Sequence, residues 1–490
     1  MENIKNNKGG VKLCYEGYRY TVKSKGVHTI RWECAERSGQ VCNGKITSTF
    51  DRKDIIPGSL IAHSHEPSDT TTDIQKTRME MKENAKTKKA KTNQLYSEAM
   101  QSATEGVRAG IGKSETVKRD IRRQKRGVRP KEPKCLSEIS FEDSEFWTTT
   151  GEAEPKPFLI HDSGPDAADR ILVFASEEGL RLLARSHQWH MDGNFKMAPK
   201  FSKQVYVIRV PFGESAVSCV YAILPGKKQT IYEELFDAII SKVDNLGFDV
   251  DPKTIITDYE MAVIQATENK FGKEVQTQGC YYHLTQSTWR KIQDLGLVEL
   301  YRSRESIRQF CGMLDGLALL AVSDVAAGMQ LLKDKIPAGL DDLVTYFDAT
   351  YVSGSYKKIK VPAHDGRVVI KLRRTPPLFP PVVWNVHQAT LNDGDRTNNI
   401  CEGWNNGFMQ LVGQQHPSIW FLIEGFQQDH AVVMTALAQD RIGERLQRKK
   451  PKRAVKTFNA RLKNLCQDRA NDTKSIEEFL AGVGDCIRFK

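Results

Sequence analysis

The sequence predicts a mixed α/β protein in which helices pack on one sheet, preceded by a small β module. Three observations carry this prediction. Three strand-length apolar runs follow one another within residues 187–224, and helix-length and strand-length runs then alternate to residue 296. Residues 11–68 hold short alternating runs with Gly, Cys, His and aromatic residues. From about residue 300 helical periodicity dominates, so a helical part accompanies the sheet.

The composition is that of a globular protein. The chain has 490 residues, of which 39% are hydrophobic and 27% charged. These values argue against a largely disordered, collagenous or coiled-coil chain, and the length favours two or three folded units. No apolar run reaches the roughly 18 residues that a membrane span needs, and the N-terminal MENIKNNKGGVK lacks the apolar stretch of a secretory signal. We therefore expect an intracellular protein without membrane contact, whose ten scattered cysteines serve as core thiols or metal ligands.

The positive charge is concentrated in one stretch. Residues 76–134 contain 18 Lys or Arg against 7 Asp or Glu, which accounts for the entire net charge of +11. Within it, six basic residues are candidates for DNA contact: Lys118, Arg119, Arg122, Arg123, Lys125 and Arg126. A second cluster, RKKPKRAVK, covers residues 448–456. Such clusters occur in solvated linkers, in surfaces that contact phosphate backbones and in nuclear import signals, and composition alone leaves these alternatives open.

Changes in composition divide the chain into six segments. They are a β module at 11–68, a basic linker or helical DNA-contact segment at 69–135, the first part of the α/β core at 155–300, a mostly helical insertion at 301–385, helices completing the core at 386–440, and a basic helical tail at 441–490. A Pro-rich stretch, RRTPPLFPPVV, interrupts the helical pattern of the insertion at 373–383.

The central region gives the most readable order of elements. We expect strands at 187–197, 203–210 and 216–224, a helix at 230–248 ending at Gly247, a strand at 253–258, a helix at 259–272, a short strand leading to 279–283 and a helix at 284–296. This β-β-β-α-β-α-β-α order implies one mixed sheet with helices packed on it. It resembles the order found in ribonuclease H-like nucleases.

Three acids are candidates for a site on this sheet. Asp192 lies on the polar face of the first strand, and Asp258 ends the buried strand at 253–258. Sheets of this kind build sites at the carboxyl ends of neighbouring strands, so the two acids are expected close together. Glu402 lies in RTNNICEGWNNGF, where apolar residues recur at helical intervals. Carboxylates suit Mg²⁺ or Mn²⁺, and two such ions about 4 Å apart can promote phosphoryl transfer, although a single acid is more often a surface or capping residue.

Two cysteines and two histidines are candidates for a zinc site in the β module. Cys34 and Cys42 are followed after twenty residues by His63 and His65. Thiolate and imidazole are the ligands that zinc prefers, and a bound ion would stabilise a module whose own core is small. The alternative is a chance grouping in a polar segment.

The motifs of this module resemble those of a FLYWCH-type zinc finger. GYRY at 17–20, WEC at 32–34, Cys42, ITSTF at 46–50 and HSH at 63–65 carry the resemblance. It implies a zinc-bound β module that binds DNA or a protein partner.

A second resemblance covers about residues 155–430. WHMDGNFK, YAILPGKKQTIYEELF, IITDYEMA, GCYYHLTQSTWRKIQDLGL and NNICEGWNNGF resemble, in order and spacing, the transposase domain of Mutator-like elements (MULE). The resemblance implies a ribonuclease H-like core with a helical insertion and a DDE triad, for which Asp192, Asp258 and Glu402 are the matching residues.

Two further positions bear on that resemblance. Cys280 and His283 match the family's C-x2-H motif, and we interpret them as a packed, hydrogen-bonded pair near the site rather than as direct metal ligands, because two ligands cannot close a tetrahedral zinc site. Asn405 stands where the family often has His, a departure that bears on activity.

The sequence thus predicts a nuclear DNA transposase. It would bind terminal inverted repeats and target DNA as a homodimer or higher oligomer, with structural Zn²⁺ in the finger and catalytic Mg²⁺ or Mn²⁺ in the core. The alternative is a domesticated, catalytically inactive, transposase-derived DNA-binding transcriptional regulator. A nuclear protein-interaction module is a third hypothesis.

Overall fold

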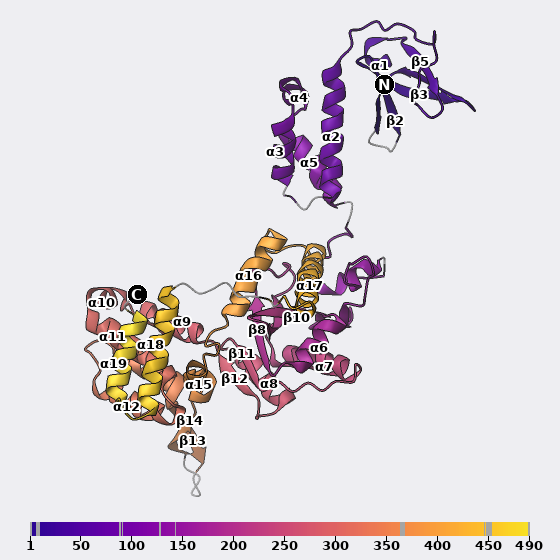
Figure 1. Ribbon diagram of the computed structural model, residues 1–490. Helices are drawn as coiled ribbons and strands as arrows, with labels where there is room; N and C mark the ends of the chain where they lie inside the picture. Colours follow the sequence, from indigo (N-terminus) through magenta and orange to yellow (C-terminus); the bar gives the residue numbers. More distant parts are fainter. Residues whose placement is uncertain are drawn as a thin grey trace. The chain divides into compact units, whose positions relative to one another are not determined.

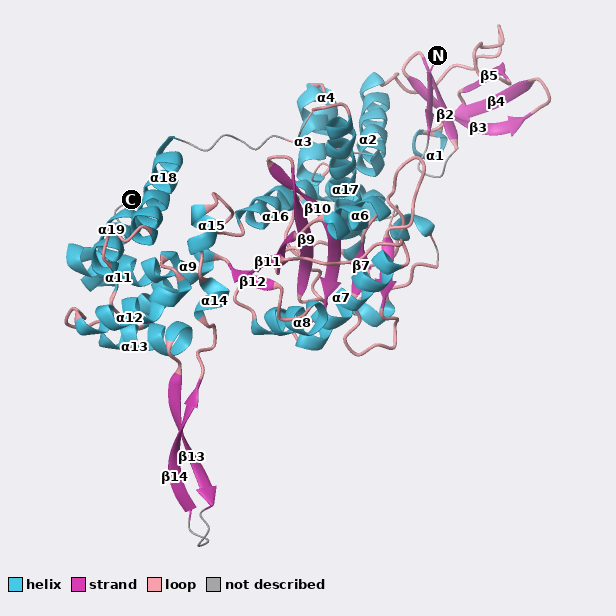
Figure 2. Ribbon diagram, turned by 60° about the horizontal axis from the view of Figure 1, so that its bottom comes forward, coloured by secondary structure: helices cyan, strands magenta, loops and turns pink. Residues whose placement is uncertain are grey.

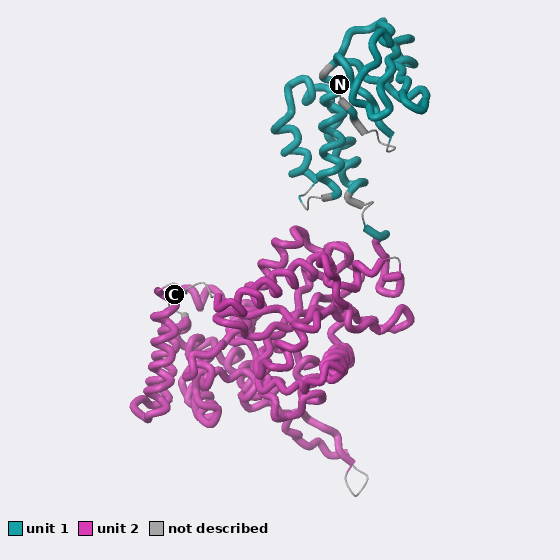
Figure 3. The backbone as a smooth tube through the Cα atoms, turned by 45° about the vertical axis from the view of Figure 1, so that its right-hand side comes forward, with its two compact units in different colours: residues 1–131 teal, residues 132–490 magenta. Residues whose placement is uncertain are grey.

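The computed structural model describes residues 2–5, 10–87, 90, 92–126, 129–142, 144–362, 368–444, 446 and 453–488. The chain divides into two compact units, residues 1–131 and 132–490 (Figure 3). Among the described residues, no helix is long and apolar enough to cross a membrane.

Unit 1 begins with an antiparallel sheet whose strands pair in chain order (Figure 1). The strands are β1 (Glu2–Lys5), β2 (Val11–Tyr15), β3 (Tyr18–Lys25), β4 (Thr29–Cys34) and β5 (Lys45–Thr49), with a short helix α1 (Arg37–Gln40) after β4. Its small core packs around Tyr20 and Trp32, whose indole N–H donates to Ser48 Oγ at 2.8 Å. Strand β1 lies outside the module expected at 11–68, yet Glu2 pairs with Cys14, so the sheet starts earlier than the sequence pattern indicates.

The basic segment that follows is helical. It forms α2 (Asp69–Thr87), α3 (Thr92–Ser102), α4 (Glu105–Gly110) and α5 (Ser114–Arg126). Apolar residues one turn apart on α5, Val117 and Ile121, are buried against Met81 and Leu95. These helices therefore have a core of their own.

Unit 2 contains a seven-stranded mixed sheet, in the order β12-β11-β8-β9-β10-β7-β6. The strands are β6 (Leu159–Asp162), β7 (Leu172–Phe174), β8 (Gln188–Asn194), β9 (Gln204–Phe212), β10 (Ser215–Leu224), β11 (Thr254–Thr257) and β12 (Gln276–Gly279). β8, β9 and β10 form the expected antiparallel meander, and β11 and β12 run parallel to β8. β6 and β7 extend the sheet on the far side of β10 and were not predicted.

Helices cover both faces of this sheet. α6 (Glu177–Arg185), α7 (Gln229–Asp244) and α8 (Met261–Phe271) pack on one face, and α16 (Asn399–Val412) and α17 (Ile419–Arg441) pack on the other. Side chains of β9 alternate between the two, with Val205 and Val207 on one side and Ile208 and Val210 on the other. α7 ends at Asp244, before the expected Gly247, which adopts a left-handed φ of 76° in the following turn.

The region between β12 and α16 is mainly helical. After α9 (Tyr281–Asp294) it contains α10 (Val298–Ser303), α11 (Glu305–Gly316), α12 (Val325–Asp334), α13 (Asp341–Phe347), α14 (Pro381–Trp384) and α15 (His387–Leu391). Short 3₁₀ helices at Leu317–Leu319 and Val322–Asp324 and a π-helical turn at Asp348–Val352 lie between them. It also holds a two-stranded hairpin, β13 (Ser355–Pro362) and β14 (Val368–Thr375), which was not predicted.

The C-terminal segment, expected as a basic helical tail at 441–490, contains two helices that pack on the rest of unit 2. α18 (Arg453–Ala470) and α19 (Ile476–Arg488) pack against the insertion, and Leu462, Phe479 and Leu480 are fully buried there. Because α19 lies along α11, this segment completes the core of the insertion.

Candidate functional site

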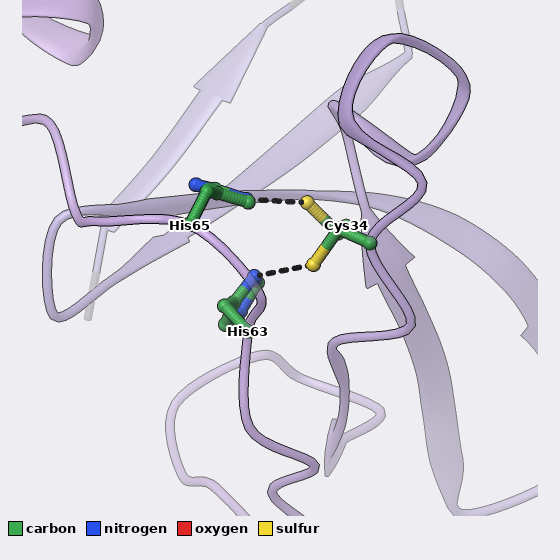
Figure 4. Close-up of side chains that lie close together, drawn as sticks. Cys34, His63 and His65 are labelled. Carbon is green, nitrogen blue, oxygen red and sulfur yellow. Dashed lines mark hydrogen bonds between the residues drawn. The ribbon is translucent and has the colours of Figure 1, made fainter.

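The sheet of unit 1 brings the four predicted zinc ligands together. Cys34 ends β4, Cys42 follows α1, and His63 and His65 lie in the loop after β5. Cys34 Sγ lies 3.3 Å from His65 Nε2 (Figure 4). Cys42 Sγ lies 3.3 Å from His63 Nδ1. All four ligand atoms lie within 4.8 Å of one another, the closeness that a tetrahedral ion requires.

Hydrogen bonds fix which ring nitrogen each histidine offers. His63 Nε2 lies 2.8 Å from the Tyr20 hydroxyl, which leaves Nδ1 facing Cys42. His65 Nδ1 donates to the backbone carbonyl of Glu66 at 3.0 Å, which leaves Nε2 facing Cys34. Such contacts of the outer nitrogen are typical of metal-binding histidines, so the donor set fits zinc.

The two thiols differ in their readiness for a metal, because burial raises the pKa of Cys34 above its usual value whereas the pKa of Cys42 is lowered. Burial raises the pKa of Cys42, but backbone hydrogen bonds from Ser64 and Gly44 outweigh it and lower the pKa to about 7. The Cys42 thiolate, which is the form that binds zinc, is therefore accessible near neutral pH.

In unit 2, the strand register places the first two predicted acids side by side. β8 and β11 run parallel, with Ile256 opposite His190. Two residues further along in the same register, Asp258 stands opposite Asp192, where β8 and β11 approach their carboxyl ends. Both acids line one small cavity together with Tyr206, Lys227 and Glu260.

Helix α16 brings in the third acid. The Asn398 side chain, fully buried just before α16, donates to the Met191 carbonyl of β8 at 2.8 Å, and its backbone N–H lies 3.2 Å from Cys280 Sγ. These contacts hold the first turn of α16 against the strand ends. As a result, a nitrogen of His283, Cys280 Sγ and an oxygen of Glu402 all lie within 4.8 Å of one another.

Asp192 is held from two sides. Its Oδ1 accepts from the backbone N–H of Gly193 at 2.8 Å, and its Oδ2 accepts from Asn405 Nδ2 at 2.6 Å. Asn194 in turn donates to Asn405 Oδ1 at 2.9 Å. Burial, together with the charge of Asp258, raises the pKa of Asp192 to about 7. A buried carboxylate beside a second carboxylate attracts cations.

Asp258 and Glu402 face His283 and Cys280. His283 Nδ1 lies 2.8 Å from Asp258 Oδ1. The contact with the Asp258 carboxylate, and to a smaller extent the contact with Cys280, raises the pKa of His283 to about 11. Glu402 Oε1 is buried and has no hydrogen-bond partner among the described residues. Three carboxylates with such an unpaired oxygen are a donor set that suits Mg²⁺ or Mn²⁺.

Comparison with known families gives two matches. A model of the MULE transposase domain matches residues 188–287, which include Asp192, Asp258, Cys280 and His283. A model of the FLYWCH zinc finger domain matches residues 3–65. The chain carries a MULE transposase domain and an N-terminal FLYWCH zinc finger. A search of curated proteins found no match.

The finger match follows a structural module closely, whereas the MULE match covers only part of the unit 2 sheet. The FLYWCH finger includes β1, which the sequence pattern missed, and it closes at the fourth ligand, His65. The MULE match ends within α9, so Glu402 lies outside it. Glu402 joins the site only through the docking of α16.

The six predicted DNA-contact residues lie on α5 of unit 1. Arg119, Arg122 and Arg123 are exposed on the side of the helix opposite Val117 and Ile121. Lys118 lies over the Tyr96 ring and is partly covered. Lys125 and Arg126 belong to the helix, but their side chains lie outside the described residues, as does most of the 448–456 cluster.

Sequence reasoning missed the asparagines that organise the carboxylates. Asn405 attracted attention only as a departure from a family pattern, as did Asn194, which stands where the family often has Thr, and Asn398 was not assigned a role. Their partners lie more than 200 residues away in the chain, so no local pattern could have identified them.

Proposed function

We propose that this protein is a DNA transposase of the Mutator-like type, which binds terminal inverted repeats and cleaves and transfers DNA strands at the carboxylates Asp192, Asp258 and Glu402. The observation that carries the proposal is that Asp192 and Asp258 of the MULE domain line one cavity, while Glu402 of α16 joins Cys280 and His283 in a cluster next to Asp258. The buried Oε1 of Glu402 has no hydrogen-bond partner among the described residues. Phosphoryl transfer needs a site that gathers negative groups around cations in this way.

The topology supports a ribonuclease H-like core. Three antiparallel strands followed by two parallel ones place β8 at the centre of β10-β9-β8-β11-β12, with helices on both faces. In such a sheet the acids at the ends of β8 and β11 share one edge.

Mg²⁺ or Mn²⁺ would be held by Asp192, Asp258 and Glu402. When bound, such ions would supply positive charge that favours a deprotonated nucleophile and stabilises the leaving oxygen. The protein's own contribution is to fix the carboxylates. Asn405 and the Gly193 N–H hold both oxygens of Asp192, and His283 holds Asp258 from the opposite side.

The reaction consists of two displacements at phosphorus. Water attacks the phosphodiester at the element end, the bond to the 3′-oxygen breaks, and a free 3′-hydroxyl remains. That hydroxyl then attacks a phosphodiester of target DNA, and the target strand's own 3′-oxygen leaves. Because two element ends react together, we propose that a homodimer or larger assembly acts in the nucleus.

Unit 1 would recognise the DNA. α4 and α5 are joined by a three-residue turn in which Gly112 has a φ of 89°, as in helix-turn-helix modules. The exposed arginines of α5 would then face a groove and its phosphates, while the zinc-bound finger adds a second contact.

The test is strand cleavage by purified protein of a duplex that carries the sequences flanking its own coding region. We expect cleavage in Mg²⁺ or Mn²⁺ by the wild type and none by Asp258→Asn or Glu402→Gln, with DNA binding retained. Asp294→Asn, an exposed acid at the far end of α9, is the matched control and should cleave normally.

Two other results would change the conclusion. Cleavage retained by Asp258→Asn would refute the site. Tight binding without cleavage by the wild type in either ion would instead favour the inactive, transposase-derived regulator.

A further inference from the structure

The β13–β14 hairpin projects from the helical part of unit 2, away from the body of the unit (Figure 2). Its strands pair in strict register, from Ser355 opposite Thr375 to Pro362 opposite Val368. Neither strand contributes to a buried core, because every described residue of the two strands is exposed or only partly buried.

The composition of the hairpin is unusual for a solvent-exposed ribbon. The two strands contain six basic residues and no acid: Lys357, Lys358, Lys360, Lys371, Arg373 and Arg374. The pairing register puts Tyr356, Ile370 and Leu372 on one face, where they are 68%, 64% and 66% exposed. Lys358 and Lys360 stand on that same face, opposite Leu372 and Ile370. The apolar side chains Ile359, Val361 and Val369 lie on the other face.

This arrangement is costly for a hairpin in water. An isolated two-stranded ribbon is only marginally stable, and like charges directly opposite one another destabilise it further. Lys357 and Arg373 form such a pair. The charge and the exposed apolar face together indicate a polyanionic partner that offers both phosphates and apolar surface.

The root of the hairpin is fixed rigidly. Gly354 has a φ of 80°, and a Cβ there would lie 2.1 Å from the Thr375 carbonyl oxygen, so only glycine allows the two strands to start this close together. Nearby, the Trp384 indole N–H donates to the carbonyls of Tyr351 and Phe379 at 2.9 and 3.0 Å. The ribbon is therefore held out in a set direction.

The same root touches the carboxylate site. Phe379 packs against Tyr259 with ring centroids 5.2 Å apart, and Tyr351 stacks on Phe379 at 6.0 Å. Tyr259 is the residue directly after Asp258, and it leaves no room for a side chain at Gly279. A ligand bound along the hairpin is thus tied through one aromatic cluster to the strand end that carries Asp258.

We propose that β13–β14 is a DNA-binding arm, which lies along duplex DNA and holds the segment next to the bond that is cut. This inference rests on the proposed function for its substrate, and its surface is separate from the finger and from α5. Charge complementarity selects the partner: six basic residues without an acid match phosphates, and the apolar face with Lys358 and Lys360 suits a groove, as β-ribbon readers use it.

The experiment measures the affinity of the full chain for a 30-base-pair duplex over a range of salt concentrations. In Lys358→Gln/Lys360→Gln, the loss of two phosphate contacts should lower the slope of log affinity against log salt by about 1.8 and weaken binding about tenfold or more at ~0.1 M salt. Lys253→Gln/Lys273→Gln is the matched control. These exposed lysines lie before the amino ends of β11 and β12, whereas Asp258 lies at the carboxyl end of β11. The variant should therefore bind DNA like the wild type.

Three outcomes decide between the alternatives. An unchanged slope in the hairpin variant, with normal binding by the wild type, would overturn the arm and leave the proposed function standing. An absence of cleavage together with the reduced slope would overturn the proposed function and retain the arm. If Ile370→Ser/Leu372→Ser dissociates an oligomer in sedimentation equilibrium and the lysine variant binds DNA normally, the face is an interface between copies and the arm is refuted.

Discussion

The absence of a side chain at Gly44 leaves the space that the His63 ring occupies. A Cβ atom there would lie 2.5 Å from ring atoms of His63, closer than such contacts occur, so the ring would have to turn. His63 is stacked on Tyr18 at 3.8 Å and bonded to Tyr20, which leaves it little freedom. The position of this ligand therefore depends on a residue that does not touch the metal.

We predict that Gly44→Ala weakens zinc binding by about 10–100-fold with all four ligands intact, as is common when the surroundings of a ligand are changed. Competition with a chromogenic chelator measures the affinity. Gly39→Ala, where a Cβ meets nothing within 4 Å, is the control and should bind like the wild type. Equal affinities of the two variants would show that His63 can shift without loss.

His430 gives a prediction for pH. It is buried against Phe158, burial lowers its pKa below the usual 6.5, and the nearest carboxylate, Glu152, is 3.6 Å away. The unfolded chain thus binds this proton more readily than the folded one, so the stability that His430 contributes is present above pH 6.5 and is lost as the pH falls below it.

His430→Gln should therefore reduce the loss of thermal stability of unit 2 between pH 7.5 and pH 5.5. The measurement is the unfolding temperature of wild type and variant at both values. Identical decreases in the two proteins would mean that His430 does not titrate in this range.

Site residues could be predicted from the sequence where candidate ligands lie close together along the chain. The C-x7-C and H-x-H spacings predicted the two cysteines and two histidines that the structure groups together, and the strand pattern predicted that Asp192 and Asp258 lie on neighbouring strands. The hydrogen bond from Asn405 to Asp192 could not be predicted, because it depends on how α16 packs against β8.

The elements α18 and α19 show how a charged composition can conceal a buried helix. Leu480 on α19 is fully buried beside Gly316 of α11, although the segment as a whole is polar. A few side chains on each helix bind it to the insertion: Leu462, Leu465 and Cys466 of α18, and Phe479, Leu480, Val483 and Cys486 of α19.

Leu480→Ala should lower the free energy of unfolding of unit 2 by about 2–5 kcal/mol, the usual cost of removing a buried leucine. Leu411→Ala, on α16 and 40% exposed, is the matched control and should cost much less. Denaturant titration gives both values. A cost for Leu480→Ala no larger than the control's would mean that α19 is only loosely attached.

Elements with a core were predicted better than those without one. The meander β8–β10 and the units that follow match the expected order, because their apolar faces repeat with regular periods. The β13–β14 hairpin alternates lysines with apolar residues on both faces and buries neither, so its pattern resembles a loop as much as a strand. The short β6 and β7 contribute three or four residues each and carry too little periodicity to detect.

At the scale of the whole molecule, the two units divided at residue 131 differ in what stabilises their folds. The unit 2 sheet is stabilised by large apolar layers on both faces, whereas in the described part of the finger the core cluster consists of five buried apolar side chains, Tyr20 and Trp32 among them. A module with so small a core needs the ion for its fold. Removal of zinc should therefore destabilise the finger of unit 1 and not the sheet of unit 2.

Chelation of zinc should unfold the finger and leave the main thermal transition of unit 2 unchanged. In calorimetry of the full chain without added Mg²⁺, we expect a chelator to remove one transition, since binding free energy is folding free energy for such sites. Cys34→Ser should show the same loss without chelator and no further change with it. If chelation instead shifts the transition of unit 2 while Cys34→Ser leaves it in place, a second zinc ion binds within unit 2, and the cluster of Cys280, His283 and Glu402 is the place to look for it.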